Sequence, residues 1–190
     1  MSRVIVALGG NLDHPAARLL KVMAELDDLP RTQLLRVSSL YRTAPVGYAD
    51  QPDFINAVAL IETALPPQAL MTELLAMEQR HGRLRAMQNG PRTLDLDLLL
   101  YENQVLDDSF VTLPHPRMHQ RAFVLAPLLD VAPDCDIPRY GSASSLFAAC
   151  ADRDEVVLLE SACFDWGIHT LRKLGKGLIA MSPSPSVQSH

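Results

Sequence analysis

Lysine is scarce in this 190-residue chain and occurs only at Lys21, Lys173 and Lys176. All other basic side chains are arginines, and 17 basic against 22 acidic groups leave a formal net charge of −5. Arginine suits two-pronged contacts with phosphate, but the net negative charge argues against a broad nucleic-acid-binding surface. We therefore expect anions to be bound at a local site and expect no nucleic-acid partner.

Cysteine is also rare. Cys135, Cys150 and Cys163 form an odd-numbered set without CxxC spacing. This argues against a disulfide framework and against a cysteine-rich zinc site, and it favours reduced thiols in a cytosolic protein.

Long hydrophobic runs are missing as well. The N-terminal apolar run spans only residues 4–8, which is too short for the core of a signal peptide, and no later stretch reaches the roughly 18 apolar residues of a membrane span. We expect a soluble, cytoplasmic protein that has no membrane partner.

The common glycine-rich phosphate loops do not occur. The sequence Gly9-Gly10-Asn11 fits neither the GxGxxG pattern of dinucleotide-binding folds nor the GxxxxGKS/T pattern of P-loops, and the GxSxG of serine hydrolases is absent. Any phosphate site in this chain must therefore be built from other elements.

The composition that is present, 48% hydrophobic and 21% charged, is that of a globular protein. The length fits one domain with a tail. We expect one folded domain over residues 1–160 and a C-terminal extension over residues 161–190, of which the polar, proline-punctuated stretch 182–190 is expected to be disordered.

The pattern of apolar residues predicts alternating strands and helices. Asp13 is the expected cap of the first helix, and a hairpin is expected near Glu102-Asn103, leading to a short strand at 105–106. The strands are expected at residues 4–8, 33–43, 54–63 and 93–101, and the helices at about 15–29, 67–81 and 119–129. This order, βαββαβ, indicates a ferredoxin-like α+β fold with additional helices on one side.

Two aspartates stand out in the strand expected over residues 93–101. Side chains alternate along a strand, so the leucines share one face while Asp95 and Asp97 share the other, about 7 Å apart. Two like charges there are costly unless a cation compensates, and Mg²⁺, which takes carboxylate and phosphate oxygens, is the natural candidate. Arg92 could counter phosphate charge beside them. The alternative, a solvated outer face that carries two aspartates, stays open on the pattern alone.

A second group of candidates is basic. His115 is held between two prolines, and Arg121 follows at an expected helix start, where anions bind favourably. Arg83 and Arg85 lie in the loop before the aspartate strand, as in phosphoryl-transfer sites that close over a nucleotide. The alternative interpretation is an ordinary polar surface.

Phe54 and Phe123 are the aromatic candidates in a chain with only 5% aromatic residues. Each of them fits a place in the core or against a planar ring, and the sequence pattern does not choose.

Taken together, these residues resemble the 6-hydroxymethyl-7,8-dihydropterin pyrophosphokinase family of folate biosynthesis over about residues 3–138. The motifs follow in the family's order: residues 7–12 (ALGGNL), 38–43 (SSLYRT), Pro45 with Gly47, 51–57 (QPDFINA), 90–97 (GPRTLDLD), 113–118 (LPHPRM) and 121–123 (RAF). The run GPRTLDLD is highly specific at this place. The family's fold is ferredoxin-like, as the order of elements indicates independently.

The resemblance implies transfer of the pyrophosphoryl group of ATP to the hydroxymethyl oxygen of the pterin, with release of AMP, by an enzyme we expect to be a monomer. It implies that Asp95 and Asp97 hold two Mg²⁺ ions that bridge the ATP phosphates. The catalytic residues it implies are Arg83, Arg92 and Asp97. The pterin-binding residues it implies are Thr43, Pro45, Val46, Phe54, Asn56 and Phe123. The ATP-binding residues it implies are Glu78, Arg85, Arg92, Leu98, Thr112, His115 and Arg121.

The chain departs from the family pattern at three places. Many members carry Ser where Gly10 stands, and many carry Trp where this chain has Asn89, in a loop that is one residue shorter. Phe110 stands where some members place an arginine near ATP. The departure at Asn89 bears on how the loop covers the pterin.

Two other function classes fit parts of the pattern. Paired aspartates on a ferredoxin-like sheet also serve polymerase and cyclase chemistry, but the net charge disfavours a nucleic-acid track. A non-catalytic binding module predicts ATP binding that does not depend on metal.

Overall fold

The computed structural model describes residues 1–45, 50–83 and 90–159. Its strands, in chain order, are β1 (Ser2–Gly10), β2 (Thr32–Val37), β3 (Tyr41–Thr43), β4 (Phe54–Thr63), β5 (Asp95–Tyr101), β6 (Leu106–Asp107), β7 (Thr112–Leu113), β8 (Asp136–Ile137), β9 (Gly141–Ser142) and β10 (Val157–Leu158). Its helices are α1 (Pro15–Asp27), α2 (Pro67–Arg80), α3 (Ala122–Val131) and α4 (Ala143–Ala149), with 3-10 turns η1 (Met118–Gln120) and η2 (Arg153–Glu155).

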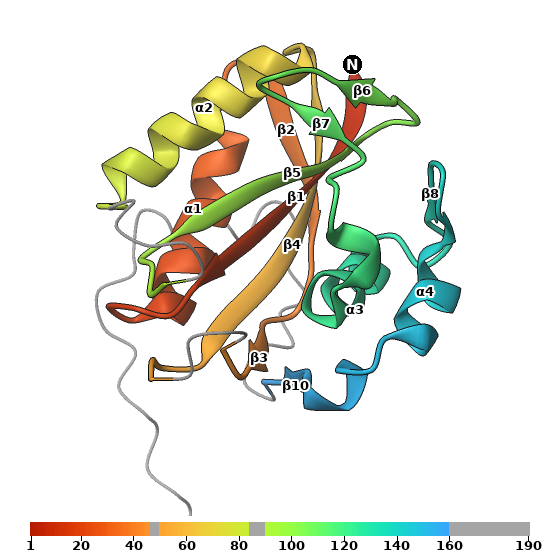
Figure 1. The fold of residues 1–190 in the computed structure, drawn as a ribbon. Coiled ribbons are helices and arrows are strands. Elements are labelled where there is room, and N and C mark those ends of the chain that lie inside the picture. Colours follow the sequence, from red (N-terminus) through yellow and green to blue (C-terminus); the bar gives the residue numbers. More distant parts are fainter. Residues whose placement is uncertain (46–49, 84–89, 160–190) are drawn as a thin grey trace, which may run out of the picture.

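The main sheet is antiparallel, and β1 lies near its centre. Strand β1 pairs with β4 on one side and with β5 on the other. Both β2 and β3 pair with β4, and β10 extends the sheet beyond β3. If β2 and β3 are counted as one interrupted strand, the order and pairing are those of a ferredoxin-like α+β fold (Figure 1). The predicted fold class is therefore confirmed.

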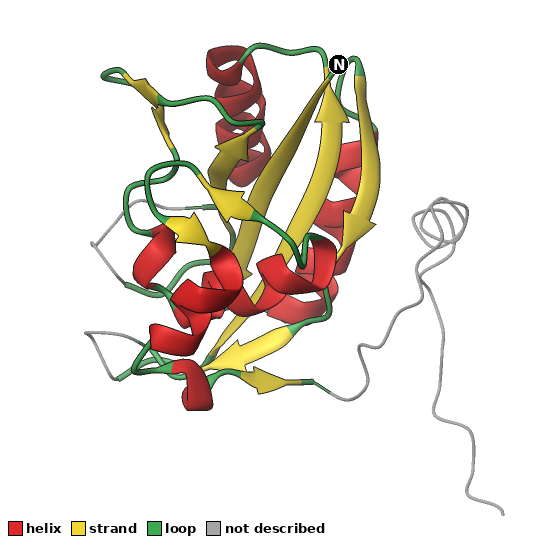
Figure 2. Ribbon diagram, turned by 90° about the vertical axis from the view of Figure 1, so that its right-hand side faces the viewer, coloured by secondary structure: helices red, strands yellow, loops and turns green. Residues whose placement is uncertain are grey.

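Helices cover both faces of the sheet (Figure 2). On one face, α1 and α2 pack against Val4, Val6 and Leu8 of β1. On the other face, α3 and α4 pack around Ile5, in keeping with the two-residue alternation of a strand. The additional helices predicted on one side are α3 and α4, and they leave one end of this second face open for a cavity.

The N-cap of the first helix lies one residue later in the chain than predicted. His14 is the N-cap residue of α1, in the left-handed conformation and without a side-chain capping hydrogen bond, so the prediction for Asp13 is wrong. Pro15 opens the helix, where its missing N–H costs nothing. The apolar stripe of the helix then packs into the core below the sheet.

The strand predicted over residues 33–43 is two strands, separated by residues 38–40. The backbone amide of Ser38 still donates to the carbonyl oxygen of Val58 in β4, and the Ser38 side chain adds two further bonds. Its Oγ accepts the amide of Val58, and its hydroxyl donates to the carbonyl oxygen of Ser39. The predicted hairpin is also wrong in its partner: β6 pairs with β7 and not with β5. Helix α3 begins at Ala122, after η1, and not near residue 119.

The expected C-terminal extension, residues 161–190, lies outside the described residues. Within the described ranges, none of the helices combines the length and the apolar character needed to cross a bilayer.

Candidate functional site

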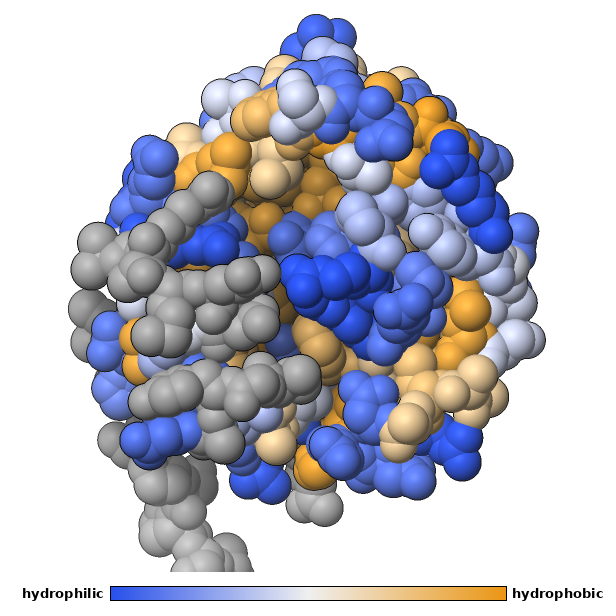
Figure 3. Space-filling view, in the orientation of Figure 1, coloured by the Kyte–Doolittle hydropathy of each residue, from blue (hydrophilic) through white to orange (hydrophobic). Residues whose placement is uncertain are grey.

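A cavity of about 250 Å³ opens at the end of the sheet where β1 finishes and β4 begins. It lies between the sheet and the N-terminal end of α3. In the view of Figure 3, the surface is hollowed near its middle, and strongly hydrophilic residues gather beside the hollow. Its described lining consists of Ala7, Leu8, Gly9, Thr43, Ala44, Phe54, Asn56, Ala57, Arg92, Asp95, Asp97, Arg117, Gln120, Arg121, Phe123, Val124 and Asp152.

Small side chains on β1 make room for the cavity. Along the face that carries α3, the strand presents Ile5, then Ala7, then Gly9, so the side chains shrink toward the site. Gly9 pairs with Asn56 on one neighbouring strand and with Asp95 on the other. A Cβ atom at Gly9 would lie 3.1 Å from Oδ1 of Asn56, so glycine keeps the floor open between these two polar residues.

The two aspartates of β5 face this cavity, while Leu96 and Leu98 are buried in the core against α1 and α2. A register shift between β1 and β5 follows at Leu99, after which the alternation resumes on the opposite phase. The predicted sharing of one face by Asp95 and Asp97 is therefore confirmed.

The two carboxylates differ in their partners. Asp95 forms ion pairs with Arg83 and Arg92, each with an N···O distance of 2.6 Å. Among the described residues, Asp97 forms no ion pair of this kind. Burial, and then the negative charge of Asp95, raise the pKa of the Asp97 carboxyl above its ordinary value. The site thus contains a half-buried carboxylate whose charged form a nearby cation would stabilise.

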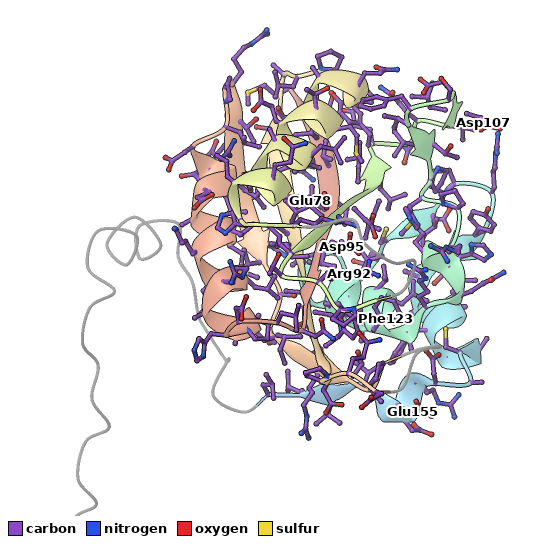
Figure 4. All side chains as sticks on the ribbon, turned by 60° about the vertical axis from the view of Figure 1, so that its left-hand side comes forward. Glu78, Arg92, Asp95, Asp107, Phe123 and Glu155 are labelled. Carbon is purple, nitrogen blue, oxygen red and sulfur yellow. The ribbon has the colours of Figure 1, made fainter. Side chains whose placement is uncertain are left out.

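Glu78 closes the side of the site nearest α2. Its side chain is almost fully buried, accepts a hydrogen bond from the amide of Leu96 at 2.7 Å, and pairs with Arg83. Burial raises the pKa of Glu78, and the bonds from Leu96 and Arg83 oppose that shift. Arg83 is therefore shared between Glu78 and Asp95. Figure 4 shows Glu78, Asp95, Arg92 and Phe123 following one another from the end of α2 toward α3.

Cations line the side nearest α3. The guanidinium carbon of Arg121 lies 5.4 Å from the ring centre of Phe123. Burial, and then the neighbouring Arg117, lower the pKa of Arg121, so a bound anion would relieve both effects. Burial also lowers the pKa of His115, and the negative charge of Asp97 opposes that shift.

The opposite wall comes from β3 and β4. Asn56 is buried, and its Nδ2 donates to the hydroxyl of Thr43 at 2.9 Å. The guanidinium carbon of Arg92 lies 5.9 Å from the ring centre of Phe54. Phe54 and Phe123 thus both line the cavity, from β4 and α3, each with an arginine beside its ring.

The structure brings eight of the fourteen described candidate residues to one cavity. Eight line the cavity: Thr43, Phe54, Asn56, Arg92, Asp95, Asp97, Arg121 and Phe123. The others that are described, namely Pro45, Glu78, Arg83, Leu98, Thr112 and His115, lie outside its lining; Leu98 belongs to the core and Thr112 to β7. Val46, Arg85 and the departure at Asn89 fall outside the described residues.

Some lining residues were missed in the sequence. Asp152 comes from the segment after α4, where no motif marks it. Gln120 lies in η1 beside Arg121, and nothing in its spacing distinguishes it. The decreasing size of Ile5, Ala7 and Gly9 is a signal that could have indicated the hollow, because a strand that loses bulk on one face leaves space there.

Comparisons with known proteins place the chain in a family. The sequence model of the family described as "7,8-dihydro-6-hydroxymethylpterin-pyrophosphokinase (HPPK)" matches residues 5–133 of this chain. The chain is 46% identical over 150 residues to the 2-amino-4-hydroxy-6-hydroxymethyldihydropteridine pyrophosphokinase of Pseudomonas aeruginosa, covering 79% of this chain and 93% of that protein. It is 40% identical over 158 residues to the enzyme of the same name from Haemophilus influenzae, covering 83% and 99%.

Solved structures agree on the fold. An HPPK-DHPS in complex with substrates matches with a TM-score of 0.60 and 13% identity, over 78% of this chain and 43% of that one. A Plasmodium falciparum HPPK-DHPS matches with a TM-score of 0.58 and 12% identity, over 77% and 43%. The chain therefore spans less than half of these longer proteins. From the match over residues 5–133 and the two bacterial relatives, the chain belongs to the 7,8-dihydro-6-hydroxymethylpterin-pyrophosphokinase family.

Proposed function

We propose that the cavity at the end of β1 is the pyrophosphokinase site, where a dihydropterin and ATP meet. The reaction of the family is pyrophosphoryl transfer in folate biosynthesis. The hydroxymethyl oxygen of the pterin attacks the β-phosphorus of ATP, the bond from that phosphorus to the oxygen bridging to the α-phosphate breaks, AMP leaves and the hydroxyl proton is released. The observation that carries the proposal is the meeting of a carboxylate pair, two ring-bearing walls and several arginines in one cavity.

The aspartate pair fits Mg²⁺ carried with the nucleotide. Among the residues that the structure describes, no group of three or more His, Cys, Asp or Glu side chains is arranged to hold a metal ion. Asp95 and Asp97 alone therefore suit ions whose remaining ligands are phosphate oxygens and water, which is how Mg²⁺ is usually held. Two ions between these carboxylates and the phosphates would neutralise charge that develops on the transferring group.

We assign the pterin to the space between Phe54 and Phe123. A flat bicyclic ring buries both of its faces against two aromatic side chains at little entropic cost. Asn56 and Thr43, already hydrogen-bonded to each other, offer polar atoms to the edge of the ring. Pro45 and Val46 continue the chain from Thr43 and complete this assignment.

We assign ATP to the side formed by β5, α2 and the segment before α3, with Glu78, Arg85, Leu98, Thr112, His115 and Arg121 as its binding residues. Arg121 carries a charge that burial disfavours, and a phosphate is the natural partner for it. His115 is held in place by a hydrogen bond from its amide to the carbonyl oxygen of Leu99, on the aspartate strand.

Arg83, Arg92 and Asp97 are the proposed catalytic residues. Both arginines pair with Asp95, within reach of phosphates that an Asp95-bound ion would bring. Catalysis here depends on holding the hydroxyl in line with the β-phosphorus and on neutralising charge, and both are tasks of positioned cations. We further propose that residues 1–160 act as a cytoplasmic, monomeric domain.

The experiment is a single assay with purified protein, ATP, Mg²⁺ and 6-hydroxymethyl-7,8-dihydropterin, in which chromatography separates the nucleotide products. AMP appearing in step with the pterin pyrophosphate supports the proposal. ADP would place the attack on the γ-phosphorus and contradict it. Omitting Mg²⁺ should abolish turnover, whereas ATP binding that is indifferent to metal favours a non-catalytic binding module.

A further inference from the structure

Asn11 follows the last residue of β1 and is buried, with 3% of its surface exposed. Its side chain does not line the cavity, but both the oxygen and the nitrogen of its side-chain amide form hydrogen bonds. Oδ1 accepts the amide of Arg92 at 2.9 Å, and Nδ2 donates to Oε1 of Gln51 and to the carbonyl oxygen of Pro52, each at 3.0 Å. The Asn11 amide completes the set by donating to the carbonyl oxygen of Arg92 at 3.0 Å.

These bonds join two segments that are far apart in the sequence. Pro52 lies two residues before Phe54, the proposed pterin wall. Arg92 stands three residues before Asp95 and pairs with it. Because one buried amide group is bonded to both segments, the spacing between the Phe54 ring and the Arg92 guanidinium depends on Asn11. That spacing is the 5.9 Å contact between them.

The neighbouring Gly10 makes this arrangement possible. A Cβ atom at Gly10 would lie 2.6 Å from the carbonyl oxygen of Thr93, which is backbone and cannot rotate away. In this chain, a larger residue at this position would require the 92–93 segment to shift away from the end of β1. The close approach that glycine allows is what brings the Arg92 backbone within hydrogen-bonding distance of Asn11.

We propose that Asn11, with Gly10 beside it, is a positioning residue that fixes Arg92 relative to the aromatic wall of the pterin site. It acts through Arg92 and Phe54 and touches neither substrate. This inference rests on the roles proposed above for those two residues. A buried amide suits the task because it offers two donors and an acceptor in one plane, and each bonded group loses little freedom when substrate arrives.

The test compares Asn11→Ala with a control that is equally buried and distant from the site. Thr63 is fully buried at the other end of the sheet, and its hydroxyl is bonded to Thr32 and to the amide of Leu65. Thr63→Val keeps the shape of the side chain and removes those bonds, so it reports the effect of lost stability alone.

Asn11→Ala is expected to weaken pterin binding about tenfold, measured with a non-hydrolysable ATP analogue and Mg²⁺, and to lower kcat about tenfold. Affinity for the nucleotide should fall less, by under about threefold, because Arg92 is bonded to Asn11 whereas the proposed nucleotide contacts at Glu78 and His115 are not. Thr63→Val should leave all three quantities within about twofold of wild type. Equal losses of pterin and nucleotide affinity in Asn11→Ala, or unchanged constants, would overturn the proposal.

Two measurements keep the proposal testable without turnover. Hydrogen exchange at the Arg92 amide, which donates to Asn11, should accelerate in Asn11→Ala and stay protected in Thr63→Val. Unchanged exchange in Asn11→Ala contradicts the proposal, whether or not the protein makes AMP. Should Asn11→Ala fail to fold, Gly10→Ala displaces the same segment without removing a hydrogen-bonding side chain, and wild-type pterin binding and Arg92 exchange in that variant would equally overturn it.

Discussion

The two ends of one sheet face are built from the same strands and the same helix, yet they differ in size and charge of their side chains. At one end, Gly9, Asn56 and Asp97 face the start of α3 across the cavity. At the other end, Ile5, Leu60 and Leu100 lie beneath the last turn of α3 in an open groove. We refer to these as the site end and the far end.

The comparison shows that the site end is hollow because its side chains are small. It also shows that the polar and charged side chains there are unfavourable to desolvate and need partners. At the far end, Ile5 and Leu100 are 6% and 5% exposed and contribute burial of apolar surface. At the site end, glycine, asparagine and aspartate contribute little such burial. The site end therefore gains less from apolar burial than the far end does, and of its two carboxylates Asp95 is stabilised by ion pairs with two arginines.

The largest effect is expected at Asp97, because the apolar residues that define the far end of the face offer no counterpart to this carboxylate. Asp97→Ala removes a proposed ligand of Mg²⁺ and should lower kcat at least about a hundredfold while the protein stays folded. The matched control is Asp107→Ala on β6, which Figure 4 shows well away from Glu78, Asp95 and Arg92. Turnover is measured at saturating Mg²⁺ and ATP. Near wild-type turnover in Asp97→Ala would show that the metal assignment is wrong.

Much of this arrangement could be predicted from the sequence, because it rests on short-range rules. Alternation in β5 gave the shared face of Asp95 and Asp97 and the buried face of Leu96 and Leu98. The fold followed from the order of elements and the few ways such an order can close into one antiparallel sheet.

What could not be predicted depends on contacts between distant segments. At the break between β2 and β3, the Ser38 side chain accepts the amide of Val58 on β4, a contact that no local propensity reveals. The pairing of Asp95 with both Arg83 and Arg92, the place of Asp152 in the lining and the bonds of Asn11 all require the chain to be folded first. Motif spacing identifies which residues belong to a site, whereas packing decides what each of them touches before the substrate arrives.

The next effect in size is expected for the aromatic wall. Phe123→Ala removes one ring face from the proposed pterin space and should weaken pterin binding about tenfold or more, because an aromatic side chain contributes both area and ring stacking. Nucleotide affinity should change by less than about threefold. Calorimetry with each ligand measures the split, and Tyr140→Ala, an exposed ring outside the cavity lining, is the control. Equal losses for both ligands would remove Phe123 from the pterin site.

A smaller effect concerns stability and pH. The folded-state pKa of Asp97 is raised by burial and by Asp95, so the native protein holds that proton more tightly than the unfolded chain does. Stability is therefore lost as pH rises from the ordinary aspartate pKa through the raised one. Asp97→Asn removes this loss, and without ligands it should be more stable than wild type at pH 8, with a margin that shrinks toward pH 4. Urea unfolding at several pH values measures the margin; a constant margin would contradict the assigned cause.

The smallest effect is expected when an arginine is removed from the far end. Arg36 is an exposed residue of β2 on the rim of the groove, whereas Arg121 is partly buried beside Phe123 and Asp97. Arg36→Ala should change the free energy of unfolding by less than about 0.5 kcal/mol and leave turnover within about twofold of wild type. Arg121→Ala should lower kcat/KM for ATP by at least about tenfold, because a desolvated guanidinium makes a strong contact with phosphate. Comparable losses in the two variants would mean that charge anywhere on this face supports the reaction, and that the difference between its two ends is one of packing alone.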